Sequence, residues 1–400
     1  MPSNYHEPIP ALTIEAQLKR KVRSHLNALG FQKEGNGYLS PSNSEKSAIR
    51  ELHAIKRAEK LQANSLFLEN HLPNLIENLA DGSEIDPSKI ELSLRPVRTG
   101  SADAQLFRSA SLTWSVPVSN GFGRRMRYLV WDEHHDRLAG LLALGDPVFN
   151  LAARDRAIGW TSVERAERLC NVLDAYVLGA LPPYNMLLCG KAIACLIRSR
   201  DLQQQFETKY GQSKGIISRK QKHPKLLAVT TSSSMGRSSV YNRLKLGGEQ
   251  YLKPLGYTTG WGHFHIPDDL FSDLRSFLQD QNHRYADQFA FGEGPNWRIR
   301  LIKEAFRLLG LPQNLLHHGV RRQVFIAFMA PNAEIALKTG VAPQKDTDLI
   351  TVSEINELAK IRWIVPRSQR NASYRFWKKG EIRSLFVNLD SENAVERSKI

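Results

Sequence analysis

Hydrophobic residues change their spacing along the chain at about residue 80. Between residues 11 and 29, leucine and valine recur at three- and four-residue steps, which is typical of an amphipathic helix, and Gly30 is its expected C-cap. A second helical stretch begins at Ser44, and Pro73 is expected to kink or break it. The pattern therefore predicts a helical N-terminal region over residues 1–80.

Apolar runs after residue 88 are short and separated by turn residues, as expected for β-strands. Such runs occupy residues 90–99, 110–119, 124–133, 136–145 and 226–231, and another ends near Leu178. Two helices are expected among them, one from Thr161 with Glu164 completing its cap, and one that runs to about Tyr210. Strands that alternate with helices favour an α/β (α+β) fold with a mixed sheet over residues 88–280.

Residues 281–386 combine helical periodicity with positive charge. The runs at 296–311 and 315–330 have the composition of basic helices. Residues 296–323 contain six lysines and arginines against one acidic residue. We therefore expect a basic, mostly helical C-terminal region.

The whole chain is strongly basic. Among its 400 residues, 55 Lys and Arg outnumber 40 Asp and Glu, which gives a formal net charge of +15. Such an excess points to a polyanionic partner, most commonly nucleic acid, although general solubility accounts for it as well. The best candidates for contacts with DNA are basic residues that lie in a loop without acidic residues, or that cluster beside aromatic or hydroxyl-bearing residues. These candidates are Lys214, Arg219, Lys220, Lys222, Arg237, Arg243, Arg298, Arg300, Arg321 and Arg322.

The cysteine count argues for a reducing compartment. There are three cysteines, Cys170, Cys189 and Cys195, and their spacing fits neither a zinc site nor a disulfide framework. The first residues lack the features of a signal peptide, and apolar runs stay shorter than the roughly 18 residues that cross a bilayer. The expectation is a cytoplasmic protein without a membrane partner.

The stretch from Asp174 to Arg200 passes from an apolar strand through two prolines to a loop and a helix. A glycine in such a loop lets a ligand approach the backbone, and a helix N-terminus favours an anion. We therefore regard Gly190, Lys191 and Ala192 as a candidate cofactor or phosphate site. The alternative is a tight strand-to-helix turn in which glycine serves packing.

Residues 230–248 are rich in serine and threonine and include Arg237 and Arg243. Hydroxyls and arginines suit an anion or a phosphate backbone, although the same residues could begin an N-capped helix. A base at a recognisable spacing does not accompany the serines, so the sequence does not support a hydrolase triad.

Two further pairs of residues are pocket candidates, and so is Tyr241. Asp155 and Trp160 lie in a stretch that either orients a loop or lines a pocket. His263 and His265 share one face if their run is a strand, and without an evident third ligand they suit hydrogen bonding, phosphate contact or a core role better than a metal. The sequence assigns neither a catalytic residue nor a metal.

Several long runs occur in a characteristic order. They are GDPVFNLAARDRAIGW, DAYVLGALPPYNMLLCGK, VTTSSSMGRSSVYNR, GYTTGWGHFHIPDDLF, FGEGPNWRIRLIKEAFRLLG, HHGVRR and WIVPRSQR. Together they resemble the DruA family of the Druantia anti-phage defence system over about residues 35–378.

The resemblance implies a bacterial role in resistance to phage, together with a large helicase-like partner and other products of the same operon. It also implies a central acetyltransferase-like (GNAT-like) domain, in which the loop at 188–192 would hold acyl-CoA. In such a domain, Tyr241 with residues 255–257 would correspond to the Tyr-x-x-x-Gly-Phe element of these folds. Such loops usually carry Gln or Arg three residues before the glycine, where this chain has Leu187.

Three hypotheses follow. The first is a DNA-binding defence component that acts with the helicase-like partner. The second is a CoA-dependent acyltransferase that uses Gly190 to Ala192. The third is a scaffold subunit without its own chemistry, for which charge reversal of Arg321 and Arg322 would leave phage protection intact.

Overall fold

The chain forms two compact units, each built from separate stretches of sequence. The computed structural model describes residues 12–33, 39–41, 45–119, 123–212, 221, 223–287, 295–342 and 348–386. Unit 1 consists of Met1–Glu59 and Thr259–Val320, and unit 2 consists of Lys60–Thr258 and Arg321–Ile400. The helix α2 (Lys46–Gln62) begins in the first and ends in the second.

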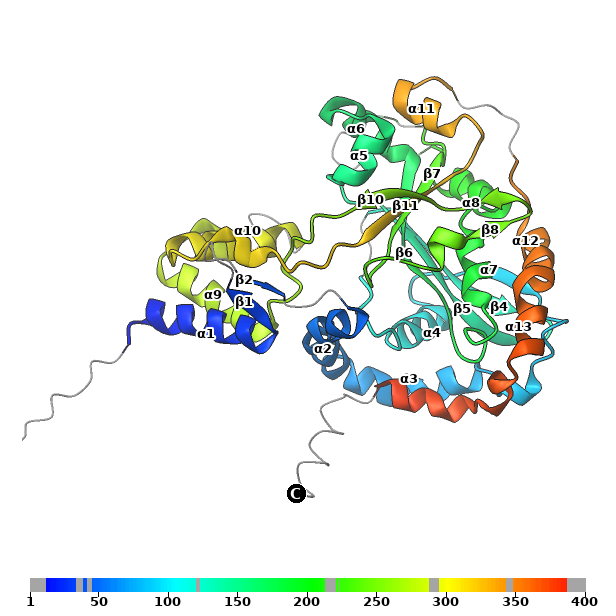
Figure 1. Cartoon of the computed structure of the whole chain (residues 1–400), viewed down its shortest axis with the longest axis horizontal. Coiled ribbons are helices and arrows are strands. Elements are labelled where there is room, and N and C mark those ends of the chain that lie inside the picture. The colour runs from blue at the N-terminus through cyan, green and yellow to red at the C-terminus, as the bar shows by residue number, and fades with distance from the viewer. Residues whose placement is uncertain are drawn as a thin grey trace, which may run out of the picture. The chain divides into compact units, whose positions relative to one another are not determined.

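Unit 1 is mainly helical. Its elements are α1 (Ile14–Ala28), β1 (Phe31–Lys33), β2 (Leu39–Pro41), α9 (Asp268–Asp280), η4 (Arg284–Ala286), α10 (Pro295–Leu308) and η6 (Gln313–Leu316). The Thr13 hydroxyl accepts from the amide of Ala16 at 3.3 Å and so caps α1. The helices α1 and α10 both pack against α9 (Figure 1). Their apolar stripes, such as Leu274 and Phe306, are buried.

Unit 2 is built around a seven-stranded sheet. The strands are β3 (Leu92–Pro96), β4 (Arg125–Asp132), β5 (Arg137–Gly145), β6 (Val172–Ala180), β7 (Ala228–Ser232), β10 (Lys253–Tyr257) and β11 (Gln323–Phe328). Their order in the sheet is β10-β11-β7-β6-β5-β4-β3. All neighbours are antiparallel except β6 and β7, which run parallel where Val172–Asp174 face Ala228–Thr230. A parallel pair requires a crossover, which α7 (Cys189–Leu196) and α8 (Arg200–Tyr210) supply.

The two faces of this sheet are covered by different helices. Side chains alternate along a strand, so Val130 points to one face and Leu129 to the other. The first face packs against α7, α8 and α12 (Val352–Ala359). The opposite face packs against α3 (Ser65–Glu77), α4 (Ala102–Ser111) and η9 (Lys379–Phe386).

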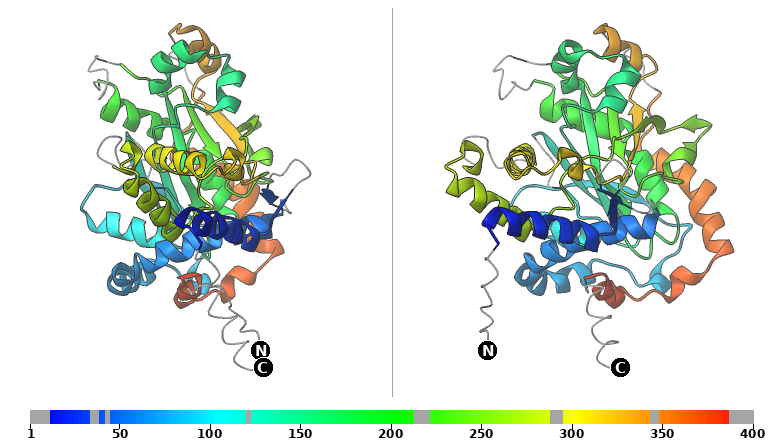
Figure 2. Two further views of the ribbon diagram at one scale, coloured as in Figure 1. Left: turned by 90° about the vertical axis from the view of Figure 1, so that its left-hand side faces the viewer. Right: turned by 60° about the vertical axis from the view of Figure 1, so that its left-hand side comes forward.

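Shorter elements complete unit 2. The helices α5 (Ala152–Ile158), α6 (Ser162–Arg168) and α11 (Ala333–Thr339) gather at one end of the sheet (Figure 2). The remaining elements are η1 (Gly82–Glu84), η2 (Leu169–Asn171), η3 (Tyr241–Arg243), β8 (Lys245–Leu246), β9 (Glu249–Gln250), η7 (Lys360–Ile364), α13 (Val365–Arg370) and η8 (Ser373–Phe376).

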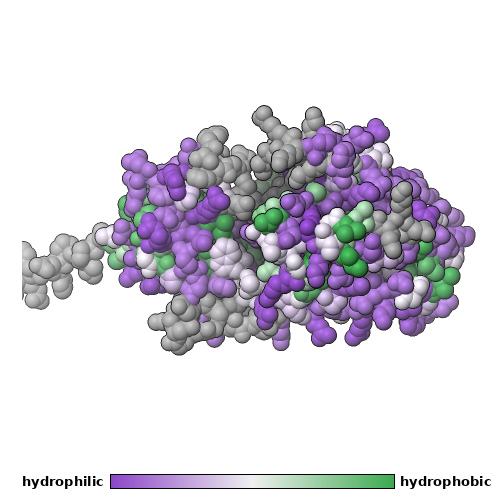
Figure 3. Space-filling view, turned by 90° about the horizontal axis from the view of Figure 1, so that it is seen from above, coloured by the Kyte–Doolittle hydropathy of each residue, from purple (hydrophilic) through white to green (hydrophobic). Residues whose placement is uncertain are grey.

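Hydrophilic residues cover most of the face shown in Figure 3, and hydrophobic residues lie among them in small groups. None of the helices in the described part of the chain combines the length and apolar character needed to span a bilayer.

The predicted mixed α/β fold is confirmed, and so is the capping box of Thr161 and Glu164. The predicted N-terminal helix is present, and Gly30 follows its C-cap with a φ of 79°. The division into regions 1–80, 88–280 and 281–386 stays a prediction.

The second helical stretch is interrupted at Asn64 rather than at Pro73, which lies inside α3. The Asn64 side-chain amide donates to the backbone carbonyl of Lys60 at 2.6 Å, near the end of α2. The backbone carbonyl of Asn64 accepts from the amide of Leu68 at 2.9 Å, at the start of α3. A local side-chain bond therefore separates the two helices.

Two other expectations are wrong. Residues 110–119 were expected as a strand, but α4 extends to Ser111, because Ser101 caps it and its apolar residues recur at helical spacing. Residues 315–330 were expected as a helix, but Gln323–Phe328 form β11, between β7 and β10. A short, wholly apolar run fits either structure, and here the available place between two strands decides.

Candidate functional site

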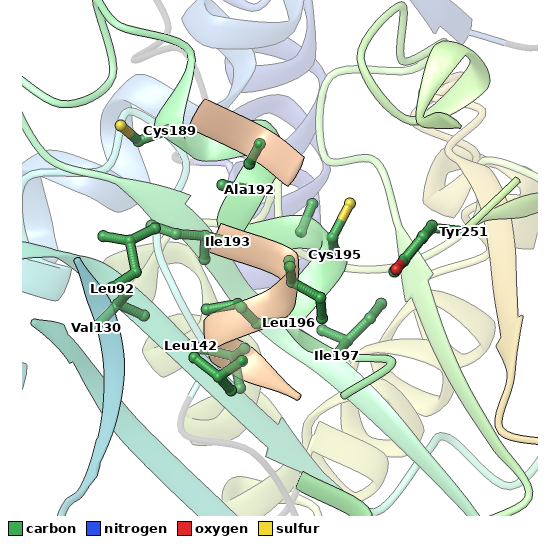
Figure 4. Packing of buried hydrophobic residues seen from close by; sticks show 14 of the residues in the cluster. Leu92, Val130, Leu142, Cys189, Ala192, Ile193, Cys195, Leu196, Ile197 and Tyr251 are labelled. Atoms are coloured by element: carbon green, nitrogen blue, oxygen red, sulfur yellow. The ribbon is translucent and has the colours of Figure 1, made fainter. Parts of the chain in front are cut away.

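The loop before α7 is held by the strand behind it and by the helix that follows. The Pro182–Pro183 bond is cis, and Leu188 at the N-cap of α7 has a φ of 64°. Ile193 and Leu196 point toward Val130 and Leu142 of the sheet, and this burial anchors the helix (Figure 4). The N-terminal turn of α7 is thus fixed in place by packing rather than by a side-chain cap.

The backbone of this turn is partly occupied. The Cys189 amide donates to the carbonyl of Tyr184 at 3.1 Å, and the Lys191 amide donates to that of Leu188 at 2.9 Å. A Cβ atom on Gly190 would meet, among the described residues, only the amide nitrogen of Ala180, at 3.9 Å. Close packing therefore does not require glycine here, whereas two nearby amides already have partners.

Positive side chains gather beside this turn. Burial lowers the pKa of Lys191, and the charges of three arginines lower it further. These arginines are Arg362, Arg243 and Arg370, all of them exposed. Lys191 Nζ lies 5.5 Å from the centre of the Trp363 ring. We call Lys191, Arg243, Arg362 and Arg370 the Lys191 cluster.

The cluster is assembled from three distant stretches of chain, each of which is fixed locally. Asn242, next to Arg243, exchanges two amide hydrogen bonds with Gln323, at 2.7 and 3.0 Å. Arg362 belongs to the π-helical turn η7, and Pro366 four residues later cannot donate to its carbonyl. Arg367 Nε donates to the carbonyl of Met186 at 3.2 Å, which ties α13 to the loop before α7.

The structure thus brings together Lys191 and Arg243, which the sequence had indicated separately. It adds Arg362 and Arg370, which sequence reasoning had missed. Their signal was the basic run around WIVPRSQR, which had contributed only to the family resemblance. Arg237 is exposed on the turn after β7. The candidates Lys214, Arg219, Lys220 and Lys222 lie outside the described residues.

Arg298 in unit 1 has a structural environment. Its Nη1 lies 2.7 Å from Asp268 Oδ1, and its Nη2 donates to the carbonyl of Ile266 at 3.0 Å. Its guanidinium also lies 4.0 Å from the centre of the Phe271 ring. These contacts hold the start of α9 against α10. Arg300, two residues further on, is exposed.

Arg321 and Arg322 differ although they are neighbours. Both precede β11, where successive side chains point to opposite sides. Arg321 is exposed with its guanidinium 5.5 Å from the Tyr257 ring centre, whereas burial lowers the pKa of Arg322. Of the two, Arg321 is the more accessible to a ligand.

Asp155 and Trp160 hold elements together. The Asp155 carboxylate pairs with Arg154 at 2.7 Å and with Arg165 at 3.0 Å. Trp160 Nε1 donates to the carbonyl of Leu337 at 2.6 Å, which joins α11 to the turn after α5. These contacts describe a structural role for both residues, and their assignment to a pocket stays a prediction. Tyr241 is similarly enclosed, and burial raises its pKa to about 12.

His263 and His265 do not lie on a strand, because β10 ends at Tyr257 and turns follow. Burial lowers the pKa of each to about 4, so both are neutral at pH 7. His265 Nε2 donates to the carbonyl of Leu315 at 3.0 Å. In the described residues, no group of three or more His, Cys, Asp or Glu side chains is arranged to hold a metal ion.

Asp174 is a titratable group that sequence reasoning had missed. It lies on β6 at the last residue paired with β7, and the Thr230 hydroxyl donates to its Oδ1 at 2.7 Å. Burial raises its pKa to about 6, although Thr230 and Arg154 act in the opposite direction. A carboxyl group with such a pKa can accept or release a proton near neutrality. Its sequence signal was an acid inside the apolar run NVLDAYVLG.

A second buried carboxylate, Asp132, forms a closed network. His135 Nδ1 donates to Asp132 Oδ2 at 2.6 Å, and the Tyr184 hydroxyl donates to the same atom at 2.9 Å. His135 Nε2 accepts from the amide of Asp86 at 3.0 Å. Both ring nitrogens of His135 are therefore occupied, and the network serves to join β4 to the loop before α7.

Comparison with known proteins identifies relatives of this chain. The family model described as "Druantia protein DruA" matches residues 43–339. The chain is 55% identical over 377 residues to the "Druantia protein DruA" of Escherichia coli (strain UMEA 4076-1), covering 94% of this chain and 93% of that protein. No solved structure is significantly similar to it. On the strength of the family match and this identity, the chain belongs to the DruA family.

Proposed function

We propose that this protein is a component of a bacterial anti-phage defence system of the Druantia type, and that it binds nucleic acid through the Lys191 cluster. Family membership supports the defence role. The observation that carries the binding role is the convergence of Lys191, Arg243, Arg362 and Arg370 from three stretches of chain. Neighbouring positive charges repel one another, so a polyanion that neutralises them gains more free energy than it would from isolated side chains.

The position of the cluster adds to this attraction. Lys191 is in the first turn of α7, where the helix macrodipole contributes ~0.3–1 kcal/mol toward an anion. Arginine also binds phosphate oxygens in a bidentate manner. A sugar–phosphate backbone presents a row of such phosphates, which suits a cluster better than a single small anion does. In this proposal the bound strand is presented to a large helicase-like partner.

The test is DNA binding by the full chain and by two charge-matched variants. Arg362→Glu with Arg370→Glu reverses the charge of two of the cluster's three exposed arginines. Arg156→Glu with Lys338→Glu reverses two exposed charges on α5 and α11 instead. We expect the first variant to lose about 100-fold in affinity at ~50 mM salt and the second to stay within about threefold of the unmodified protein. Equal losses in both variants, or no binding by the unmodified protein, would refute the proposal.

A second candidate function, a CoA-dependent acyltransferase, is favoured by the sheet. A single parallel pair, β6–β7, with α7 in the crossover supports the acetyltransferase-like (GNAT-like) assignment. The uncrowded Gly190 and the proton-accepting carboxyl of Asp174 would then serve acyl-CoA binding and proton transfer. Calorimetry with acetyl-CoA tests this proposal. The unmodified protein should give a binding heat, and a Gly190→Val variant should abolish it. Absence of heat with the unmodified chain would exclude it.

A further inference from the structure

Exposed hydrophobic residues are common on this protein, so exposure alone does not mark a site (Figure 3). The surroundings of Trp261 in unit 1 are different. Its side chain, which is 40% exposed, lines a hollow of about 460 Å³ together with Lys303, Glu304, Arg307 and Gln313. That volume falls in the range of roughly 300–1,000 Å³ in which small-molecule sites occur.

The backbone on both sides of Trp261 is fixed. The carbonyl of Gly260 accepts from the amide of Gly319 at 3.1 Å, and the amide of Gly262 donates to the carbonyl of Leu316 at 2.9 Å. Gly260 has a φ of 73°, and a Cβ atom there would come within 3.1 Å of the backbone of Gly319. Two segments of the chain thus pair through their backbones on both sides of Trp261, which fixes the position of its backbone.

Positive charge follows the exposed side of α10 beside this ring. Arg300, Lys303 and Arg307 are exposed and stand at three- and four-residue steps, so they share one face of the helix. Lys303 Nζ lies 5.5 Å from the centre of the Trp261 ring, and the Gln313 side chain donates to the carbonyl of Lys303 at 2.6 Å. The Lys303 ammonium therefore lies over the Trp261 ring, and the exposed arginines of the same helix face lie one turn to either side of Lys303.

The carboxylate in the hollow, Glu304, is already neutralised. Arg307 donates to its Oε1 at 3.0 and 2.6 Å, and His283 Nε2 lies 3.3 Å from the same atom. These partners lower the pKa of Glu304, Arg307 contributing the most, so it stays ionised and paired. An anion that approaches the ring therefore meets Lys303 and Arg300 without facing an isolated negative charge.

We propose that Trp261 is a stacking platform for an unpaired base of a nucleic acid strand, with Lys303 and Arg300 contacting the phosphates on either side. An exposed aromatic ring accepts any base, and the neighbouring cations of α10 can follow a sugar–phosphate backbone. A base inside a duplex is stacked on its neighbours and cannot reach the ring. The site thus gives the proposed nucleic-acid binding, on which it rests, a preference for single strands.

The test measures the binding of the full chain to three DNA probes of about twelve nucleotides. They are a single strand, a duplex, and an abasic single strand with the same number of phosphates as the first. Fluorescence anisotropy would measure the affinity of the unmodified protein and of the Trp261→Ala and Trp261→Phe variants. We expect Trp261→Ala to bind the single strand about tenfold more weakly, Trp261→Phe to retain affinity within about threefold, and duplex binding to stay unchanged.

The abasic strand isolates stacking from charge. The unmodified protein should bind it about tenfold more weakly than the complete strand, and in Trp261→Ala that difference should shrink to about twofold. An unchanged single-strand affinity in Trp261→Ala, or an equal loss on single strand and duplex, would overturn the stacking site while leaving DNA binding in place. Failure of the unmodified protein to bind any probe would overturn both proposals.

Discussion

The two units of this protein use positive charge in different ways. In unit 1, acidic residues of α9 pair with basic ones: Asp268 with Lys56 and Arg298, each at 2.7 Å, and Asp273 with Lys21 at 2.5 Å. In the Lys191 cluster of unit 2, arginines surround a lysine instead. A basic composition therefore contains two populations of charge, one that stabilises the fold and one that can attract a ligand. Only the structure separates them.

The units also hold buried titratable groups of opposite kinds. Unit 1 buries two histidines in the neutral form, and unit 2 buries a carboxyl that resists ionisation. Acidification therefore lowers the stability that the histidines contribute to unit 1 and raises the stability that the carboxyl contributes to unit 2.

The largest expected effect is the loss of stability in unit 1 below neutrality. His263 and His265 have pKa values lowered to about 4, against about 6.5 in an unfolded chain. The unfolded state therefore binds protons first as the pH falls, and each histidine removes up to about 3 kcal/mol of stability between pH 6.5 and 4. Urea unfolding across this range measures the loss, and His263→Gln should flatten it. An unchanged slope in that variant would contradict the assignment.

Removal of the Lys191 cluster comes next. Replacing Arg243, Arg362 and Arg370 by alanine should weaken DNA binding by about 100-fold at ~50 mM salt and reduce the slope of log affinity against log salt by about 2–3. Each lost arginine ceases to release about one counterion. Filter binding at several salt concentrations measures both values. A weaker affinity with an unaltered slope would show that the arginines act other than by contacting phosphates.

A smaller effect is expected at Asp174, with the opposite sign to that of the histidines. The pKa of Asp174 is raised to about 6 in the fold, against about 4 in an unfolded chain. Ionisation of this carboxyl therefore costs stability that grows as the pH rises from about 4 to 6 and is fully present above that range. Asp174→Asn keeps an acceptor for the Thr230 hydroxyl and should raise stability by about 2 kcal/mol at pH 7.5. Thermal unfolding at pH 7.5 and pH 4 tests this, and a gain of equal size at both would contradict it.

The smallest effect is that of Arg298→Lys, which keeps the charge but loses the guanidinium geometry. The hydrogen bond to the Ile266 carbonyl and the packing on Phe271 should weaken, which costs about 1 kcal/mol of stability. DNA affinity should not change, because this arginine is engaged by Asp268. A loss of affinity without a loss of stability would place Arg298 among the ligand-binding charges.

Local sequence determined much of the secondary structure of this protein. The capping box of Thr161 and Glu164, the helix before Gly30 and the strands at 124–133 and 136–145 follow from periodicity and capping, which act over a few residues. The same local signals failed for Gln323–Phe328, because a short apolar run fits a helix or a strand until neighbouring strands select one.

The candidate sites are formed by contacts between residues that are far apart in the chain, and a sequence pattern does not show such contacts. Lys191, Arg243 and Arg362 are far apart in the chain, and Trp261 lies some forty positions before Lys303, so only folding brings each set together. The sequence by itself determined the excess of positive charge, the alternation of strands and helices, and the family. The tertiary structure decided which charges are neutralised by an acid and which remain clustered, because electrostatic energy depends on separation in space and on burial rather than on order along the chain.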